Sequence, residues 1–80
     1  MDDQEILSRI TALVEEEDHL RRRHTEEALD HDERARIERI EIALDQCWDL
    51  LRQRRARREF DEDPEGAEVR DVDTVEHYRQ

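Results

Sequence analysis

The stretch "IERIEIALDQCWDLL", residues 37–51, decides the fold of this 80-residue chain. Its apolar side chains recur at alternating intervals of three and four residues, which keeps them on one side of an α-helix. They are Ile37, Ile40, Leu44, Cys47 and Leu51. Asp30 and Glu33 form a capping-box pattern before the stretch, and no proline interrupts the chain until Pro64. The pattern therefore predicts a helix from about residue 31 to residue 59 or 60.

Residues 6–20 carry a weaker copy of the same pattern. Ile6, Ile10, Leu13 and Leu20 occupy the apolar positions, and Glu17 takes the remaining one. Asp2 or Asp3 can cap this helix, which we expect to end near His24. The link to the second helix is short and polar, so the two helices are predicted to fold back on each other as an antiparallel hairpin.

A loop centred near residue 28 fixes the register of the hairpin. The expected apolar pairs are Ile6 with Leu51, Ile10 with Cys47, Leu13 with Leu44, and Leu20 with Ile37. The same register sets three acidic residues at the start of the first helix beside three arginines near the end of the second: Asp2, Asp3 and Glu5 beside Arg55, Arg54 and Arg52. These charges oppose slipped or reversed pairings.

The composition supports an all-α fold. One Gly, one Pro and no Asn supply too few turn residues for a many-stranded sheet. We expect a helical hairpin in residues 1–60 and a separate acidic tail in residues 61–80. In the tail, Asp63 before Pro64 is typical of a helix start, Asp73 with Glu76 is a second capping-box pattern, and apolar residues recur at Val69, Val72, Val75 and Tyr78. One or two short helices against the hairpin and a disordered tail are both compatible with this pattern.

The apolar stripe is wider than one partner helix can cover. Leu7, Val14, Ala43, Trp48 and Leu50 lie beside the seam, and Trp48 suits an interface anchor because it combines a large apolar area with a polar N–H. We expect a second copy to cover these residues in a homodimeric four-helix bundle. Coverage by the tail or by an unidentified protein partner is the alternative.

Five arginines follow the apolar stretch: Arg52, Arg54, Arg55, Arg57 and Arg58. They could bind phosphates, which gives an alternative function as a nucleic-acid or ribosome-associated factor. The net charge of −11 disfavours such a partner, and no aromatic residues alternate with the arginines to stack on bases. The sequence favours a solvated helix end whose arginines pair with nearby acids.

No pattern of residues names an enzyme. The chain lacks a Gly-rich phosphate loop, a Cys pair at zinc spacing and a Ser-His-Asp set, so we expect neither catalysis nor a cofactor. Cys47 falls in the seam, where it should behave as a small buried hydrophobe. Glu16 and His19 have the Glu-x-x-His spacing of di-iron bundles, which makes a metal-binding bundle a second alternative. Glu17 is better explained as a polar residue that sets the register and pairs with Arg21.

The location of the protein is predicted from what the sequence lacks. The N-terminus has no basic leader before an apolar run, and no segment approaches the roughly 20 apolar residues that span a bilayer. A lone cysteine, Cys47, suits a reducing compartment. We therefore expect a cytoplasmic protein with no membrane partner.

Three parts of the sequence together resemble a known family. They are "ALDQCWDLLRQRRARRE", the opening "DQEILSRITALVEEE", and the tail pieces "DP" and "VEHY". They resemble a group of short actinobacterial proteins that form a family of unknown function. The resemblance covers most of the chain and implies that the 80 residues form one complete protein. It implies no activity, ligand or catalytic residue.

Overall fold

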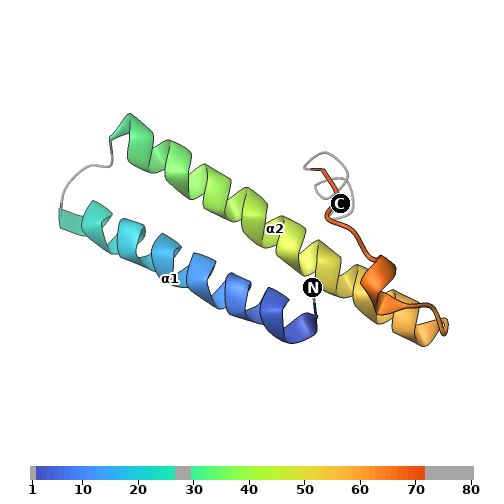
Figure 1. The fold of residues 1–80 in the computed structure, drawn as a ribbon. Coiled ribbons are helices and arrows are strands. Elements are labelled where there is room, and N and C mark those ends of the chain that lie inside the picture. The colour runs from blue at the N-terminus through green and yellow to red at the C-terminus, as the bar shows by residue number, and fades with distance from the viewer. Residues whose placement is uncertain (1, 27–29, 72–80) are drawn as a thin grey trace.

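The computed structural model describes residues 2–26 and 30–71, and it confirms the predicted helical hairpin. Helix α1 spans Asp3–Glu26, helix α2 spans His31–Glu59, and a 3-10 turn, η1, spans Pro64–Gly66. Figure 1 shows α1 and α2 side by side in opposite directions, with η1 beside the C-terminal end of α2. The described residues contain no strand, and neither of their long helices is apolar enough to cross a membrane.

Both long helices begin at capping boxes. The Asp30 carboxylate accepts a hydrogen bond from the Glu33 N–H at 2.8 Å, and the Glu33 side chain accepts one from the Asp30 N–H. This confirms the predicted start of α2. Asp2 and Glu5 make the same pair of hydrogen bonds at the start of α1. Each box satisfies backbone N–H groups that the first helical turn leaves without a partner.

Helix α2 ends at a Schellman motif rather than at a glycine. The Glu62 N–H donates to the Arg57 carbonyl at 2.7 Å, and the Asp61 N–H donates to the Arg58 carbonyl at 3.3 Å. Asp61 adopts the left-handed conformation that this motif requires, with φ of 57°. Aspartate tolerates that conformation better than most residues, so the chain can reverse here without glycine.

The hydrophobic core follows the predicted register. Its buried cluster consists of Ile6, Ile10, Cys47 and Leu50, and Leu13, Leu44, Leu51 and Ala67 pack against it. Both members of the first three predicted apolar pairs therefore belong to one core. Ile37 and Ile40 are also buried, nearer the loop between the helices. The apolar seam therefore extends along the hairpin, because the apolar sides of the two helices face each other in this register.

Ion pairs mark both ends of the seam. Arg54 Nε lies 2.5 Å from a carboxylate oxygen of Asp3 at one end, and Arg23 lies 3.5 Å from Glu33 at the other. The contact between Arg54 and Asp3 is the predicted one. Glu17 pairs with Arg21 at 3.5 Å, also as expected. Arg54 is buried, whereas the pairs Arg23–Glu33 and Arg21–Glu17 are at least partly exposed, and each of these contributes only about 0 to 1 kcal/mol.

The described part of the tail begins as the sequence predicts. The Asp63 carboxylate accepts a hydrogen bond from the Glu65 N–H at 3.0 Å, and Pro64 opens the 3-10 turn. Residues beyond the turn continue along α2 without helical structure up to residue 71. The second predicted capping box, Asp73 with Glu76, and the apolar residues Val72, Val75 and Tyr78 lie outside the described residues.

Candidate protein interface

The seam between the helices has two distinct sides, each marked by an ion pair. On one side, Arg21 contacts Glu41 at 2.7 Å. On the other side, the Glu16 carboxylate contacts the Arg36 guanidinium. Side chains seven residues apart lie on nearly the same side of a helix, so these two contacts assign the neighbouring residues to one side or the other.

The side marked by Arg21 and Glu41 carries exposed apolar side chains. Leu7 and Val14 precede Arg21 at intervals of seven residues, and Trp48 follows Glu41 at the same interval. Leu7 is 42% exposed, Val14 43% and Trp48 46%. We call the surface formed by these three residues the Trp48 face. It brings together three of the five predicted interface residues.

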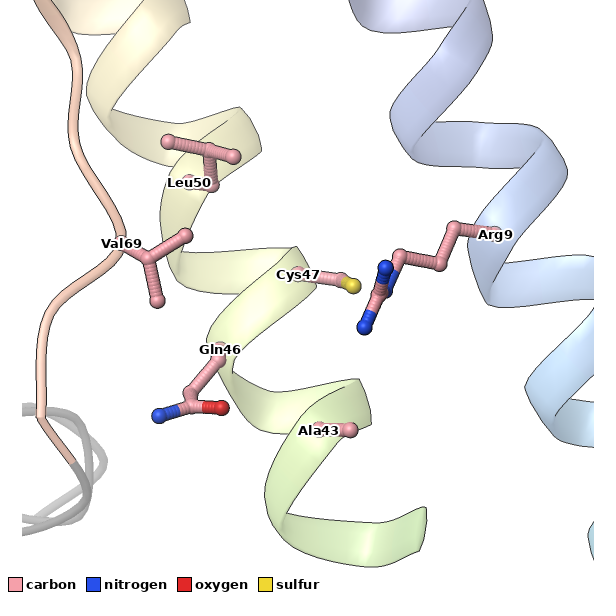
Figure 2. Close-up of a pocket in the computed structure, with 6 residues that line it drawn as sticks. All are labelled: Arg9, Ala43, Gln46, Cys47, Leu50 and Val69. Carbon is pink, nitrogen blue, oxygen red and sulfur yellow. The ribbon is translucent and has the colours of Figure 1, made fainter. Parts of the chain in front are cut away.

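The opposite side carries Arg9, Ala43 and Leu50, and the tail covers it. Figure 2 shows Arg9, Ala43, Cys47 and Leu50 around a groove that Val69 of the tail also lines. The groove has a volume of about 170 Å³. We call this surface the tail face.

Two predicted interface residues therefore lie on the wrong side of the seam for the Trp48 face. Leu50 is only 6% exposed and belongs to the core cluster, so in the single chain it is not part of the exposed surface. Ala43 is half-buried and lines the groove of the tail face. The reason is that Ala67 and Val69 approach this side of α2, and the tail supplies the cover that a second copy was expected to supply.

A row of polar residues on α2 holds the tail. Gln53 donates to the Glu68 carbonyl at 2.6 Å and accepts from the Glu68 N–H at 3.3 Å. One turn or two earlier, Gln46 donates to the Arg70 carbonyl at 3.2 Å, and Asp49 accepts both Nε and Nη hydrogen bonds from the Arg70 side chain. Residues 68–70 are thereby fixed along α2 by side-chain contacts to their backbone and to Arg70.

Asp49 is the functional residue that sequence reasoning missed. Its side chain is fully buried, although it is an acid. Burial raises the pKa of the Asp49 carboxyl, but the hydrogen bonds from Arg70 and Gln53 outweigh it, and the net pKa is lowered. The signal in the sequence is the run of Gln46, Asp49 and Gln53 on one side of α2, together with an arginine in an acidic tail.

The arginine-rich end of α2 is paired with acids of the same chain. The closest distances for four of its arginines are 3.8 Å from Arg52 to Asp49, 3.3 Å from Arg55 to Glu59, 3.6 Å from Arg57 to Glu62 and 2.9 Å from Arg58 to Asp3. The fifth, Arg54, is buried and contacts Asp3 and Glu65, so its guanidinium is less accessible to an anion than those of the other four. Burying a charged guanidinium costs free energy unless it is paired. The carboxylates of Asp3 and Glu65, which face Arg54, offset this cost.

The Asp3 contacts predict a loss of stability in acid. Hydrogen bonds from Arg54 and Arg58 lower the pKa of Asp3 below its ordinary value of 3.8. The unfolded chain therefore binds this proton first, and the stabilisation present at neutral pH is lost as the pH falls through the lowered pKa. We expect Asp3→Asn to be less stable than the wild type at pH 7 and equally stable near pH 2. Chemical denaturation at both pH values measures this, and a difference that persists unchanged at pH 2 contradicts it.

The residues considered for chemistry do not converge. Cys47 is buried, burial raises the pKa of its thiol, and the guanidinium of Arg9 offsets this effect only in part, so the thiol form is favoured. Glu16 pairs with Arg36, and His19, one turn further along α1, is exposed. Among residues 2–26 and 30–71, no three His, Cys, Asp or Glu side chains lie close enough to hold a metal ion.

Fold and surface together define a small all-helical hairpin with one covered face and one open apolar face. The chain belongs to the family described as "Protein of unknown function (DUF2630)", which matches residues 2–80. Similar proteins include an uncharacterised protein of Mycobacterium bovis and uncharacterised proteins of two Mycobacterium tuberculosis strains. Each is 49% identical over 77 residues, covering 95% of this chain and 88% of the relative. No solved structure matches the chain. The family resemblance predicted from the sequence is confirmed.

Proposed function

We propose that this protein is a non-enzymatic helical protein that self-associates through the Trp48 face and acts through protein–protein contacts. The observation that carries the proposal is the half-exposure of Leu7, Val14 and Trp48 on one side of the hairpin. An apolar patch of this kind on a small chain is typical of an interaction surface. A homodimer covers it with another copy of the same patch and completes a four-helix bundle.

The energy available at Trp48 is large enough to matter. A tryptophan buries about 150 to 250 Å². Covering the exposed 46% of Trp48 thus removes about 70 to 115 Å² from water, which contributes about 2 to 3 kcal/mol per copy at about 25 cal/mol per Å². Trp48 is therefore the anchor of the proposed interface, with Leu7 and Val14 beside it.

The arginine-rich end supports this proposal over an anion-binding function. Each of its five arginines has a carboxylate partner within the chain, and Arg54 is buried. A polyanion would have to displace these partners against the net charge of −11. We keep the cytoplasmic location as part of the proposal, on the ground of the unpaired Cys47.

Replacing Trp48 tests the proposal. We expect the wild type to sediment as a dimer at micromolar concentration and Trp48→Ser to weaken self-association at least about a hundredfold, since an interface anchor lost from both copies costs several kcal/mol. Analytical ultracentrifugation over a concentration series measures this. Circular dichroism shows whether the variant keeps its helices.

Ile42→Ser is the matched control for Trp48→Ser. Ile42 lies on the same helix and is 37% exposed, but it lies outside the Trp48 face. We expect Ile42→Ser to associate like the wild type. A wild-type chain that unfolds cooperatively but stays monomeric up to about 100 μM contradicts the proposal, because even a dimer of micromolar dissociation constant is populated at that concentration.

A further inference from the structure

The charged residues beside the Trp48 face have opposite signs on the two sides of Trp48 along α2. Arg55 lies seven residues after Trp48 on α2, and Glu41 lies seven residues before it. Each is about 10.5 Å from Trp48 along the helix axis, at 1.5 Å per residue. Both side chains reach solvent, with 79% of Arg55 and 51% of Glu41 exposed.

The residues around Arg55 and Glu41 keep this polarity. Arg52 and Glu59 flank Arg55, which leaves one net positive charge at this end of the face. Glu38 lies one turn before Glu41, and Arg21 contacts both Glu41 and Glu17 from α1, which leaves two net negative charges at the other end. The local partners of Arg55 and Glu41 are exposed ion pairs, which exchange at little cost.

We propose that the second copy binds the Trp48 face in the reverse direction, with a two-fold axis crossing α2 at Trp48. The inference rests on the proposed function and specifies its geometry. The axis places Trp48 against the partner's Trp48 and brings Arg55 of each copy to the partner's Glu41. A two-fold interface repeats each contact, so one dimer contains this ion pair twice.

The same-direction arrangement is disfavoured by the same charges. It sets the arginine end of one copy beside the arginine end of the other, and the glutamate ends likewise. Like charges brought together at an interface oppose association, whereas complementary charges select the register. On the tail face a second copy would have to pack around residues 67–70, which already lie along that side of α2.

The single variants Arg55→Glu and Glu41→Arg distinguish the two directions. In the same-direction arrangement position 55 meets position 55 and position 41 meets position 41, so each variant only replaces one pair of like charges by another and leaves the affinity unchanged. In the reverse direction each variant creates a new pair of like charges. Arg55→Glu alone faces the partner's Glu41, and Glu41→Arg alone faces the partner's Arg55. We expect each variant alone to self-associate about tenfold more weakly than the wild type at low salt.

Mixed in equal amounts, the two variants form a heterodimer that contains two ion pairs. One is the original pair of Glu41 with Arg55, and in the other the two charges have changed places. We expect the affinity of that heterodimer to lie within about threefold of the wild type.

The heterodimer is measured by native mass spectrometry and by sedimentation of the mixture. Arg55→Glu mixed with wild type is the control. We expect the affinity of this mixed dimer to stay low, because the new carboxylate at position 55 still meets Glu41 of the wild-type copy. If the single variants associate as tightly as the wild type, or if they fail to rescue each other, while Trp48→Ser still dissociates the wild-type dimer, the reverse direction is overturned and the proposed function stands. If the wild type is monomeric, both are overturned. Helicity equal to that of the wild type confirms that each variant folds.

Discussion

Ile40→Ala is expected to destabilise the protein by about 2 to 5 kcal/mol, the range for removing most of a buried isoleucine side chain. Ile40 is 1% exposed and lies on the seam side of α2. The substitution removes apolar contacts and leaves a cavity that the two helices can fill only by moving closer. Because a chain of 80 residues has a small core, a loss of this size is a large share of the total stability.

Ile42→Ala isolates the effect of burial. Ile42 lies two residues further along the same helix and is 37% exposed, so the change in chemistry and in helix propensity is the same at both positions. We expect Ile42→Ala to cost less than about 1 kcal/mol. Urea denaturation of the two variants and the wild type at one protein concentration gives the comparison. Equal losses at the two positions would show that the described seam is not the core of the folded protein.

The helices and their register could be predicted because they depend on repeated, local signals. The spacing of Ile37, Ile40 and Leu44 defines one side of a helix, and a capping box at Asp30 fixes where that helix starts. Charge complementarity between Asp3 and Arg54 then selects one register. Each of these signals is read from residues within a few turns of one another, or from two short segments of opposite charge.

Which side of the seam the tail covers could not be predicted from the sequence. Leu50 and Trp48 both flank the apolar stripe, and periodicity alone gives each the same status. Their difference comes from where the tail lies, and that depends on single contacts from Gln53, Asp49 and Arg70. A contact made by one polar side chain in the tertiary structure leaves no repeating pattern in the sequence. An arginine in an acidic tail is the one signal of this contact in the sequence, and it does not show which carboxylate Arg70 reaches.

The covered tail face and the open Trp48 face make different demands on the chain. On the tail face, residues 67–70 of the same chain supply apolar and polar contacts, while Val69 stays exposed beside the groove. The Trp48 face has no such segment among residues 2–26 and 30–71, and its side chains stay half-exposed. A tail that detached would expose Leu50 and give the hairpin a second apolar surface. We therefore expect the contact between Asp49 and Arg70 to keep Leu50 covered by the tail.

Arg70→Ala is expected to release residues 68–70 from α2. It leaves the Asp49 carboxylate, which is 0% exposed, without its main cationic partner. Breaking a fully buried pair from one side costs about 3 to 5 kcal/mol. Because 30% of the Arg70 side chain is exposed, we expect a smaller loss of about 2 to 3 kcal/mol. Releasing the tail hydrates Asp49 and is cheaper than burying an unpaired charge, so the tail opens while α1 and α2 stay folded.

Hydrogen exchange at the Glu68 amide measures this release, since that N–H donates to Gln53 only while the tail is bound. A loss of about 2 to 3 kcal/mol accelerates its exchange about 30- to 150-fold. Arg52→Ala is the matched control, because Arg52 approaches the same carboxylate at 3.8 Å but is 54% exposed, and we expect it to change the exchange rate only a few-fold. Equal effects of the two variants would mean that the net positive charge near Asp49, rather than the hydrogen bonds from Arg70, holds the tail against α2.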